Sequence, residues 1–209
     1  MSPLDRIVVI LDNALATLAG QPVQSVGNDP AEHVQQGNLT DVEREEAARL
    51  MRVNHVGEIC AQALYQGQSL TARDEAVRCA FLQAAREEND HLFWCDNRIK
   101  ALGGKKSFLN PFWYGGAFVM GALAGLAGDS TNLSFAVETE RQVEGHLSQH
   151  IDRLPRADRK SRTVLEQMRK DEQRHARTAR RAGGSTLPLT VRFLMRTAGR
   201  VMTNTAYHL

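Results

Sequence analysis

The feature that most constrains this chain is a Glu-x-x-His pattern that occurs twice. Glu88 is followed by His91, and Glu172 is followed by His175. In a helix, residues three apart lie on one face, so each pair can direct a carboxylate and an imidazole toward the same point. One such pair is weak evidence, because Glu and His are common on solvated helix surfaces. Two pairs in one chain favour a site built from several helices.

A further glutamate precedes each pair at a similar distance. Glu58 lies 30 residues before Glu88, and Glu140 lies 32 residues before Glu172. Ferritin-like di-metal carboxylate bundles take one Glu from each of two helices and Glu-x-x-His from each of the other two. The spacing therefore predicts a di-metal site with six ligands, namely Glu58, Glu88, His91, Glu140, Glu172 and His175.

The helical register separates these glutamates from their neighbours. Glu140 shares its helix face with the apolar residues Leu133 and Leu147. A carboxylate on a buried face is unfavourable unless it is paired or bound to a metal. Glu138 and Glu144 share their faces with polar residues, so both are expected to be solvated. Four carboxylates and two imidazoles form a hard oxygen and nitrogen ligand set that suits iron or manganese and balances two divalent ions.

The rest of the sequence predicts an all-α fold. Ala, Leu, Arg, Glu and Gln dominate, and only six prolines interrupt the chain. The run from Thr40 to Glu43 has the pattern of a capping box at a helix start. We expect an antiparallel four-helix bundle with additional N- and C-terminal helices. Residues 1–40 are expected to form a short helix and a polar linker, and residues 41–209 the bundle domain. The expected helices cover residues 1–20, 40–70, 74–101, a stretch ending at 154, 158–182 and 187–209.

Composition excludes several classes of protein. The three cysteines are odd in number and form no Cys-x-x-Cys pair, which argues against a disulfide framework or a thiolate zinc site and favours a reducing compartment. Asp5, Arg6 and Asp12 interrupt the N-terminal apolar run, so it does not resemble a signal peptide. A net charge of +2 argues against a general nucleic-acid binder.

An uncharged stretch covers residues 107–128 and is long enough to span a bilayer. Asn110, Pro111 and five glycines argue against a spanning helix. The stretch is instead expected to form a flexible apolar surface that begins with the aromatic run 112–114.

The C-terminal segment is strongly basic. Residues 153–209 carry 14 basic and four acidic groups, a net charge of +10. Arg192, Arg196 and Arg200 recur every fourth residue along one side of the last predicted helix, opposite a broad apolar side. A cationic amphipathic helix of this kind can lie in a membrane interface. The alternative is a fifth bundle helix with a solvated arginine face.

Around the six predicted ligands the chain resembles the demethoxyubiquinone hydroxylase family. The resemblance rests on Arg-Val-Asn-His-Val-Gly-Glu at 52–58, Glu-Glu-Asn-Asp-His-Leu at 87–92, Ala-Val-Glu-Thr-Glu at 136–140 and Asp-Glu-Gln-Arg-His at 171–175. It covers roughly residues 45–205. One departure is that Leu147 stands where many eukaryotic members have a tyrosine, so a relay through that tyrosine does not carry over to this chain.

The resemblance implies a membrane-associated di-iron monooxygenase of ubiquinone biosynthesis. Such an enzyme inserts one oxygen atom from O₂ into the ring of a polyprenyl demethoxy-quinol, 3-demethoxyubiquinol. It would hold two iron ions per chain through the six predicted ligands. The implied location is peripheral, on the cytoplasmic side of the cell membrane. The implied partners are the quinol, the membrane surface, lipid-presenting or other ubiquinone-biosynthesis proteins and further copies of the chain, with no nucleic acid.

Three further polar residues lie close to the motifs. Asn54 and Asp171 are candidates to orient ligand imidazoles or carboxylates from neighbouring helices, and His146 is a candidate to hydrogen-bond a ligand or the substrate from the helix flank. For Asn54 and Asp171 the alternative is an ordinary polar position on a helix, and for His146 it is a structural role. His146 follows Glu140 by six residues, about 240° around the helix, so it cannot share that ligand's face closely.

Other functions use the same residues differently. A ferritin-like ferroxidase or storage protein would use the six ligands without an organic substrate, but it needs neither the uncharged stretch nor the basic last helix. Another di-metal oxidase, such as a di-manganese catalase, would share the ligand set. A non-enzymatic membrane-associated helical adaptor would hold the Glu and His residues in salt networks and bind no metal.

Overall fold

The computed structural model describes residues 3–19 and 28–209, and within them all regular secondary structure is helical. Residues 21–27 of the expected linker lie outside the described residues. The expected all-α fold is confirmed, and each expected helix is present within two residues of its predicted ends. The helices are α1 (Pro3–Ala19), α2 (Asp41–Thr71), α3 (Glu75–Ala101), α4 (Asn110–Leu126), α5 (Asp129–Arg153), α6 (Arg159–Arg181) and α7 (Leu189–His208).

Local sequence signals determine where the helices begin and end. The side chain of Thr40 accepts a hydrogen bond from the backbone N–H of Glu43, whose carboxylate accepts one from the backbone N–H of Thr40. This is the expected capping box. Asp74 caps α3 by accepting hydrogen bonds from the backbone N–H groups of Ala76 and Val77. Beyond the end of α3, Gly103 has a positive φ of 72°, which glycine adopts without strain.

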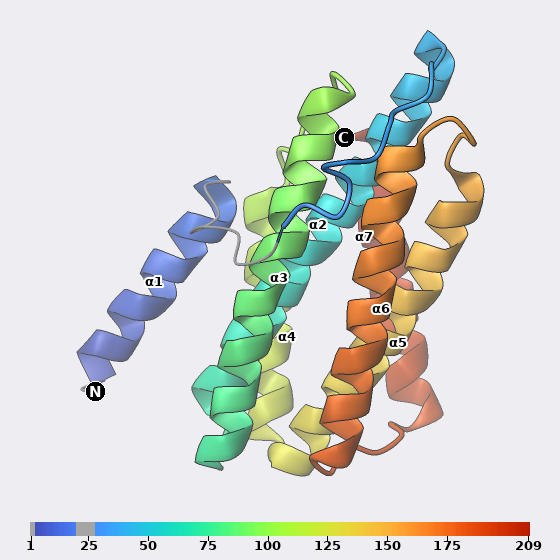
Figure 1. Ribbon diagram of the computed structural model, residues 1–209. Coiled ribbons are helices and arrows are strands. Elements are labelled where there is room, and N and C mark those ends of the chain that lie inside the picture. Colours follow the sequence, from blue (N-terminus) through green and yellow to red (C-terminus); the bar gives the residue numbers. More distant parts are fainter. Residues whose placement is uncertain (1–2, 20–27) are drawn as a thin grey trace.

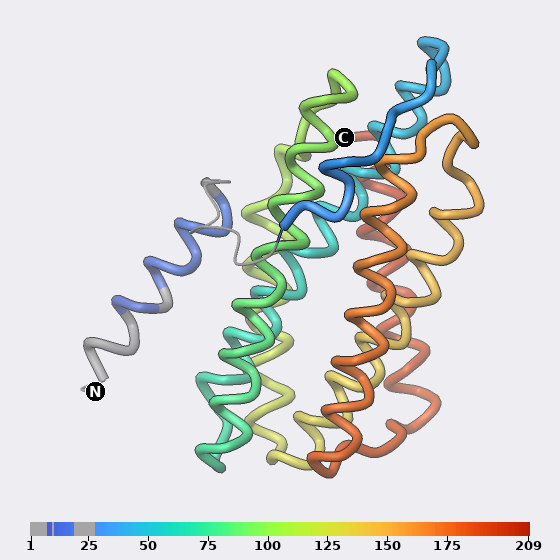
Figure 2. The backbone as a smooth tube through the Cα atoms, in the orientation of Figure 1, coloured from blue at the N-terminus to red at the C-terminus, as the bar shows by residue number. Residues whose placement is uncertain are grey.

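Four helices form the bundle, with α2 packed on α3 and α5, and α6 packed on the same two helices. Neighbouring helices of this group run antiparallel (Figure 1). The helix α4 connects the pair α2 and α3 with the pair α5 and α6, and it packs mainly against α2. The helix α7 packs against α2 and α5. Residues 28–40 cross the upper end of the bundle before α2 begins (Figure 2), where the backbone N–H of Gly37 bonds the carbonyl of Ala157 at 3.1 Å.

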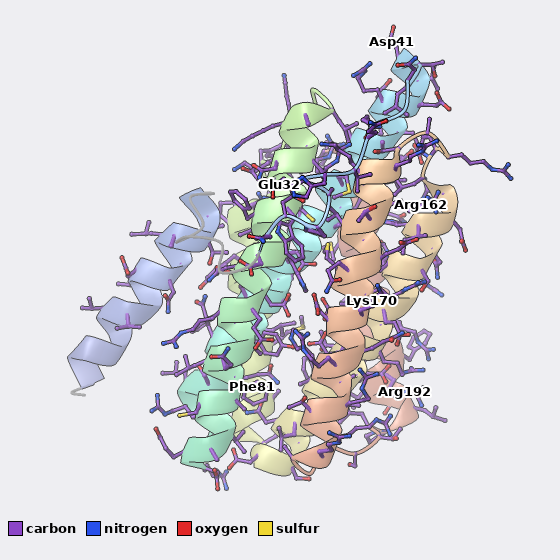
Figure 3. All side chains as sticks on the ribbon, in the orientation of Figure 1. Glu32, Asp41, Phe81, Arg162, Lys170 and Arg192 are labelled. Atoms are coloured by element: carbon purple, nitrogen blue, oxygen red, sulfur yellow. The ribbon has the colours of Figure 1, made fainter. Side chains whose placement is uncertain are left out.

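The interior of the bundle has two apolar layers. One contains Leu50, Met51, Trp94, Leu147, Leu165 and Met168. The other contains Tyr65, Phe81, Leu133 and Ala136. On α2, α3 and α5 the predicted glutamate ligand lies between a residue of the first layer and a residue of the second. Side chains fill the space between α3 and α6 (Figure 3). The predicted glutamate ligands are therefore enclosed between two apolar layers, which limit the access of water.

The uncharged stretch differs from its expected form, because most of it is the helix α4 and not a flexible surface. Two glycines allow α4 to lie tightly against α2. A Cβ added at Gly67 would stand 2.2 Å from the carbonyl oxygen of Phe118, and one added at Gly121 would stand 2.2 Å from that of Leu64. Gly121, one of the five glycines that suggested flexibility, thus permits close helix packing. No helix in the described part of the chain is long and apolar enough to cross a membrane.

The last helix also differs in detail from its expected form. Arg192, labelled in Figure 3, does not share an exposed stripe with Arg196 and Arg200. Its Nε lies 3.3 Å from Oε2 of Glu138, which is only 4% exposed and also pairs with Arg141. The expectation that Glu138 is solvated is therefore wrong, because arginines from two helices compensate its burial.

The neighbouring glutamate Glu144 is half-buried and accepts a hydrogen bond from Nε2 of Gln173 at 2.6 Å. Its carboxylate therefore contacts another helix as well as solvent. The contacts that helical periodicity does not predict, Arg192 with Glu138 and Gln173 with Glu144, both come from helices other than α5.

Candidate metal centre

The six predicted ligands come from the middle of four different helices and meet inside the bundle. Glu58 lies on α2, Glu88 and His91 on α3, Glu140 on α5, and Glu172 and His175 on α6. All are buried except His175, which is close to buried, and Glu88 is completely inaccessible to solvent. Helix periodicity alone places these side chains on the inner faces, because each shares its face with residues of the apolar layers.

The six side chains form two groups that share two glutamates. Ligand atoms of the first group lie within 4.8 Å of one another, and the same holds for the second group. The first group is Glu58, Glu88, His91 and Glu172, and the second is Glu88, Glu140, Glu172 and His175. Each group offers three carboxylates and one imidazole, and Glu88 and Glu172 belong to both. This arrangement could hold a metal site.

Both imidazoles turn Nδ1 toward the centre of the cluster. His91 Nδ1 lies 2.7 Å from Glu88 Oε2, 3.5 Å from Glu172 Oε1 and 3.6 Å from Glu58 Oε2. His175 Nδ1 lies 3.1 Å from Glu88 Oε1 and 3.8 Å from Glu172 Oε2. Each ring nitrogen thus faces several carboxylate oxygens at once, as expected for donors around a common point.

Several of these atoms make no hydrogen bond with any described residue. They are Glu58 Oε2, both carboxylate oxygens of Glu88, His91 Nδ1 and His175 Nδ1. Most buried polar atoms in proteins have a hydrogen-bond partner, and an exception requires an explanation. These unsatisfied atoms all belong to the cluster and have the chemistry of metal ligands. The residues present therefore fit a metal site.

The electrostatics of the cluster are those of closely packed acids and bases. Burial raises the pKa of Glu58 and Glu140 well above the ordinary value, and neighbouring carboxylates add to the effect. Burial opposes ionisation of Glu88 as well, but His91 and His175 outweigh it and lower its pKa. The pKa of His175 rises to about 12 because surrounding carboxylates outweigh its burial.

A second carboxylate contacts the outward nitrogen of each imidazole. His91 Nε2 lies 3.3 Å from Asp171 Oδ2, and His175 Nε2 lies 2.8 Å from Glu87 Oε2. Metal-binding histidines usually make such an outer contact, which fixes the ring orientation. Asp171 was a sequence candidate for this role. Glu87 was missed, because its partner is on another helix and only its position beside Glu88 could have suggested it.

The other two candidates lie elsewhere. Oδ1 of Asn54 faces Nδ1 of His150 at 3.0 Å, and the ring of His146 lies 3.9 Å from that of His150. Burial lowers the pKa of His146 to about 4 and that of His150 to about 2. Within the described residues, neither Asn54 nor His146 has a hydrogen bond or ion pair with a predicted ligand. Both residues instead contact His150, which is not a predicted ligand.

A helical bundle with these carboxylates and imidazoles on four helices has the architecture of the ferritin-like carboxylate proteins. The chain belongs to a family of ubiquinone biosynthesis proteins. Residues 45–206 match the family described as "Ubiquinone biosynthesis protein COQ7". The resemblance inferred from the motifs is thereby confirmed.

Curated relatives extend the match over the whole chain. A protein of Nitrosospira multiformis is 54% identical over 99% of both chains, and one of Nitrosococcus oceani is 52% identical over 99% of this chain and 97% of its own. A protein of Azoarcus sp. is 54% identical over 97% of this chain and 98% of its own. All three are named 3-demethoxyubiquinol 3-hydroxylase. The expected oxidoreductase class is therefore confirmed.

Proposed function

We propose that this chain is a 3-demethoxyubiquinol 3-hydroxylase that uses O₂ to hydroxylate the ring of a polyprenyl demethoxy-quinol. In this reaction one oxygen atom enters a ring C–H bond and the other leaves as water, with two electrons and two protons from a reductant. The observation that carries the proposal is the enclosed cluster of four glutamates and two histidines. The full-length relatives that carry this name support the choice of substrate.

The cofactor that fits the cluster is a pair of iron ions in each chain. One ion would be held by Glu58 and His91, the other by Glu140 and His175, and the shared residues Glu88 and Glu172 would contribute to both. Bound iron would supply the redox chemistry that activates O₂. Carboxylates and imidazoles form a hard oxygen and nitrogen ligand set that suits iron, and the four carboxylate charges balance two divalent ions.

The chain itself contributes enclosure and orientation. The apolar layers on either side of the cluster restrict water, which protects a reactive oxidant from side reactions. The outer carboxylates Asp171 and Glu87 hold the two imidazole rings with Nδ1 toward the cluster. Oxygen chemistry thus takes place at a point fixed by four helices.

A peripheral location on the cytoplasmic side of the cell membrane is part of the proposal. Trp113 of α4 and Met202 of α7 pack against the same buried cluster around Val53, so these two helices cover one side of the bundle. Both expose large apolar side chains, including Leu123 at 60% and Phe193 at 61% exposure. Arg196 and Arg200 are exposed on α7 and can meet anionic headgroups. A lipid-soluble quinol would reach the enzyme from this surface.

The test supplies purified protein with ferrous iron, O₂, a reductant and a short-chain demethoxy-quinone, and measures the ring product by mass. We expect a product one oxygen atom heavier, labelled when ¹⁸O₂ is used. Oxidation of iron without ring hydroxylation would support the ferroxidase alternative. The adaptor alternative would be supported if the protein contained no bound metal, both as purified and after loading with iron. Either result would overturn the proposal.

A further inference from the structure

The Glu-x-x-His repeat is longer than the ligand pairs suggest. On α3, Nε2 of Gln83 donates to Oε1 of Glu87 at 3.1 Å, four residues further on. On α6, Nε2 of Gln167 donates to Oδ2 of Asp171 at 3.1 Å with the same spacing. The repeated pattern is therefore Gln-x-x-x-acid-Glu-x-x-His, at residues 83–91 and 167–175. Each outer carboxylate is held on its own helix by an amide.

The two outer carboxylates contact histidines on opposite helices. Asp171 lies on α6 and contacts His91 of α3 at 3.3 Å, whereas Glu87 lies on α3 and contacts His175 of α6 at 2.8 Å. Each helix thus orients the imidazole that the other helix contributes. The ring orientations depend on how α3 and α6 are placed relative to one another.

One side chain joins the two outer carboxylates. Arg174 donates through Nη1 to Oδ1 of Asp171 at 2.7 Å and through Nη2 to Oε2 of Glu87 at 3.3 Å. The corresponding position of the first repeat is Asp90, so the arginine occurs in only one of the two repeats. A guanidinium group is planar and presents its donors in a fixed fork, which suits a bridge between two carboxylates.

We propose that Arg174 is a positioning residue that holds Glu87 and Asp171 together and so orients both histidines of the metal centre. The proposal rests on the proposed di-iron function, because it concerns the ligands of that site. Arg174 is 55% exposed and lies outside the buried cluster. Exposed ion pairs contribute little to folding stability, so the effect of Arg174 is expected in metal binding and not in folding.

The test is a titration of metal-free protein with Co²⁺, a spectroscopic probe for the paired site. Arg174→Met is expected to keep its helicity and melting temperature, to weaken the binding of both ions about tenfold and to change the visible absorption of bound Co²⁺. Arg174→Lys should recover only part of the affinity. It restores the positive charge, but an ammonium group cannot bridge both carboxylates in the same way. In an E87Q background the effect of Arg174→Met should be smaller, because one of its two partners is already altered.

Arg177→Met is the matched control. Arg177 is an exposed arginine of the same helix and has no ion pair with any described residue, so this variant removes the same charge without breaking the bridge. Wild-type affinity and spectrum in Arg174→Met, or an equal change in Arg177→Met, would overturn the inference while leaving the proposed function intact. If Arg174→Met fails to fold, the affinity and spectrum of Arg174→Lys decide instead, compared with those of wild type and Arg177→Met. Failure of the wild-type chain to bind either Co²⁺ or iron would instead overturn the proposed function.

Discussion

The interior of the bundle and the outer side formed by α4 and α7 depart from ordinary burial in opposite ways. Inside, carboxylates such as Glu58 and Glu88 are withdrawn from water and leave oxygen atoms unsatisfied. Outside, Leu123 and Phe193 stay in contact with water although they are large and apolar. Isolated buried charges are unfavourable, and exposed apolar side chains that cluster on one side of a protein often mark an interaction surface. Each region therefore fits a partner of its own polarity, and the partners proposed above are metal ions inside and lipid outside.

The largest expected effect comes from removing one ligand from the interior. Glu140→Ala or His175→Ala should abolish ring hydroxylation and leave most of the helicity, because neighbouring residues retain the apolar layers. Product formation by mass and far-ultraviolet circular dichroism measure the two quantities. Glu144→Ala is the matched control on the same helix, outside the cluster. Full turnover by Glu140→Ala or by metal-free protein would contradict the role assigned to the interior.

The residues of the metal cluster could be predicted from the sequence more fully than the contacts that surround them. The six cluster residues could be found because two Glu-x-x-His pairs and two preceding glutamates lie on apolar helix faces. Glu87 and Glu138 were missed or misassigned because their partners, His175 and Arg192, come from other helices. Helical periodicity describes one helix at a time and carries no information on contacts between helices.

The uncharged stretch was misinterpreted for a related reason. Its glycines suggested flexibility, whereas Gly121 allows α4 to pack against the backbone of Leu64. A glycine in a sequence is compatible with either outcome, and only the neighbouring helix decides between them. The boundaries of the helices could be predicted more closely, because caps such as Thr40 and Asp74 act through residues adjacent in sequence.

Loading the interior with metal should release protons. Burial raises the pKa of Glu58 and Glu140, and surrounding carboxylates raise the pKa of His91 and of His175, the latter to about 12. Raised pKa values favour the protonated forms, whereas metal ligands must be deprotonated. We therefore expect proton release when metal binds and weaker metal binding as the pH falls. Titration with ferrous iron or Co²⁺ in weakly buffered solution measures both, and binding without proton release would contradict this description of the interior.

The outer side can be tested by placing a charge on it. Leu123→Glu should weaken association with anionic liposomes about tenfold or more, because burial of a leucine contributes roughly 1.5–3 kcal/mol and a carboxylate is repelled by the same headgroups. Val42→Glu is the control, since Val42 is an exposed residue in the first turn of α2 and belongs to neither α4 nor α7. Sedimentation with liposomes gives the bound fraction. Wild-type protein that stays in the supernatant with liposomes and native membranes, or equal binding by Leu123→Glu, would contradict a lipid-facing surface.

The smallest expected effect concerns a buried histidine outside the cluster. His55 is 1% exposed, and neither ring nitrogen has a hydrogen-bond partner among the described residues. Burial lowers its pKa to about 4, the opposite of the shift that carboxylates cause at His91 and His175. Between pH 6.5 and 4 the unfolded chain binds a proton at this position that the folded chain does not. The stability due to neutral His55 is therefore present above pH 6.5 and decreases as the pH falls.

His55→Leu should remove this pH dependence. The slope for one group is at most about 1.4 kcal/mol per pH unit, so the free energies of unfolding of wild type and variant should differ by about 3 kcal/mol more at pH 4 than at pH 6.5. Denaturant unfolding of both proteins without metal measures the difference, and the contributions of the metal cluster cancel. The exposed His33, changed to leucine in the same way, tests whether the effect requires burial. Equal pH dependence in wild type and His55→Leu would show that burial does not lower the pKa of His55. It would also remove the contrast between His55 and the cluster histidines, whose pKa values are raised by carboxylates.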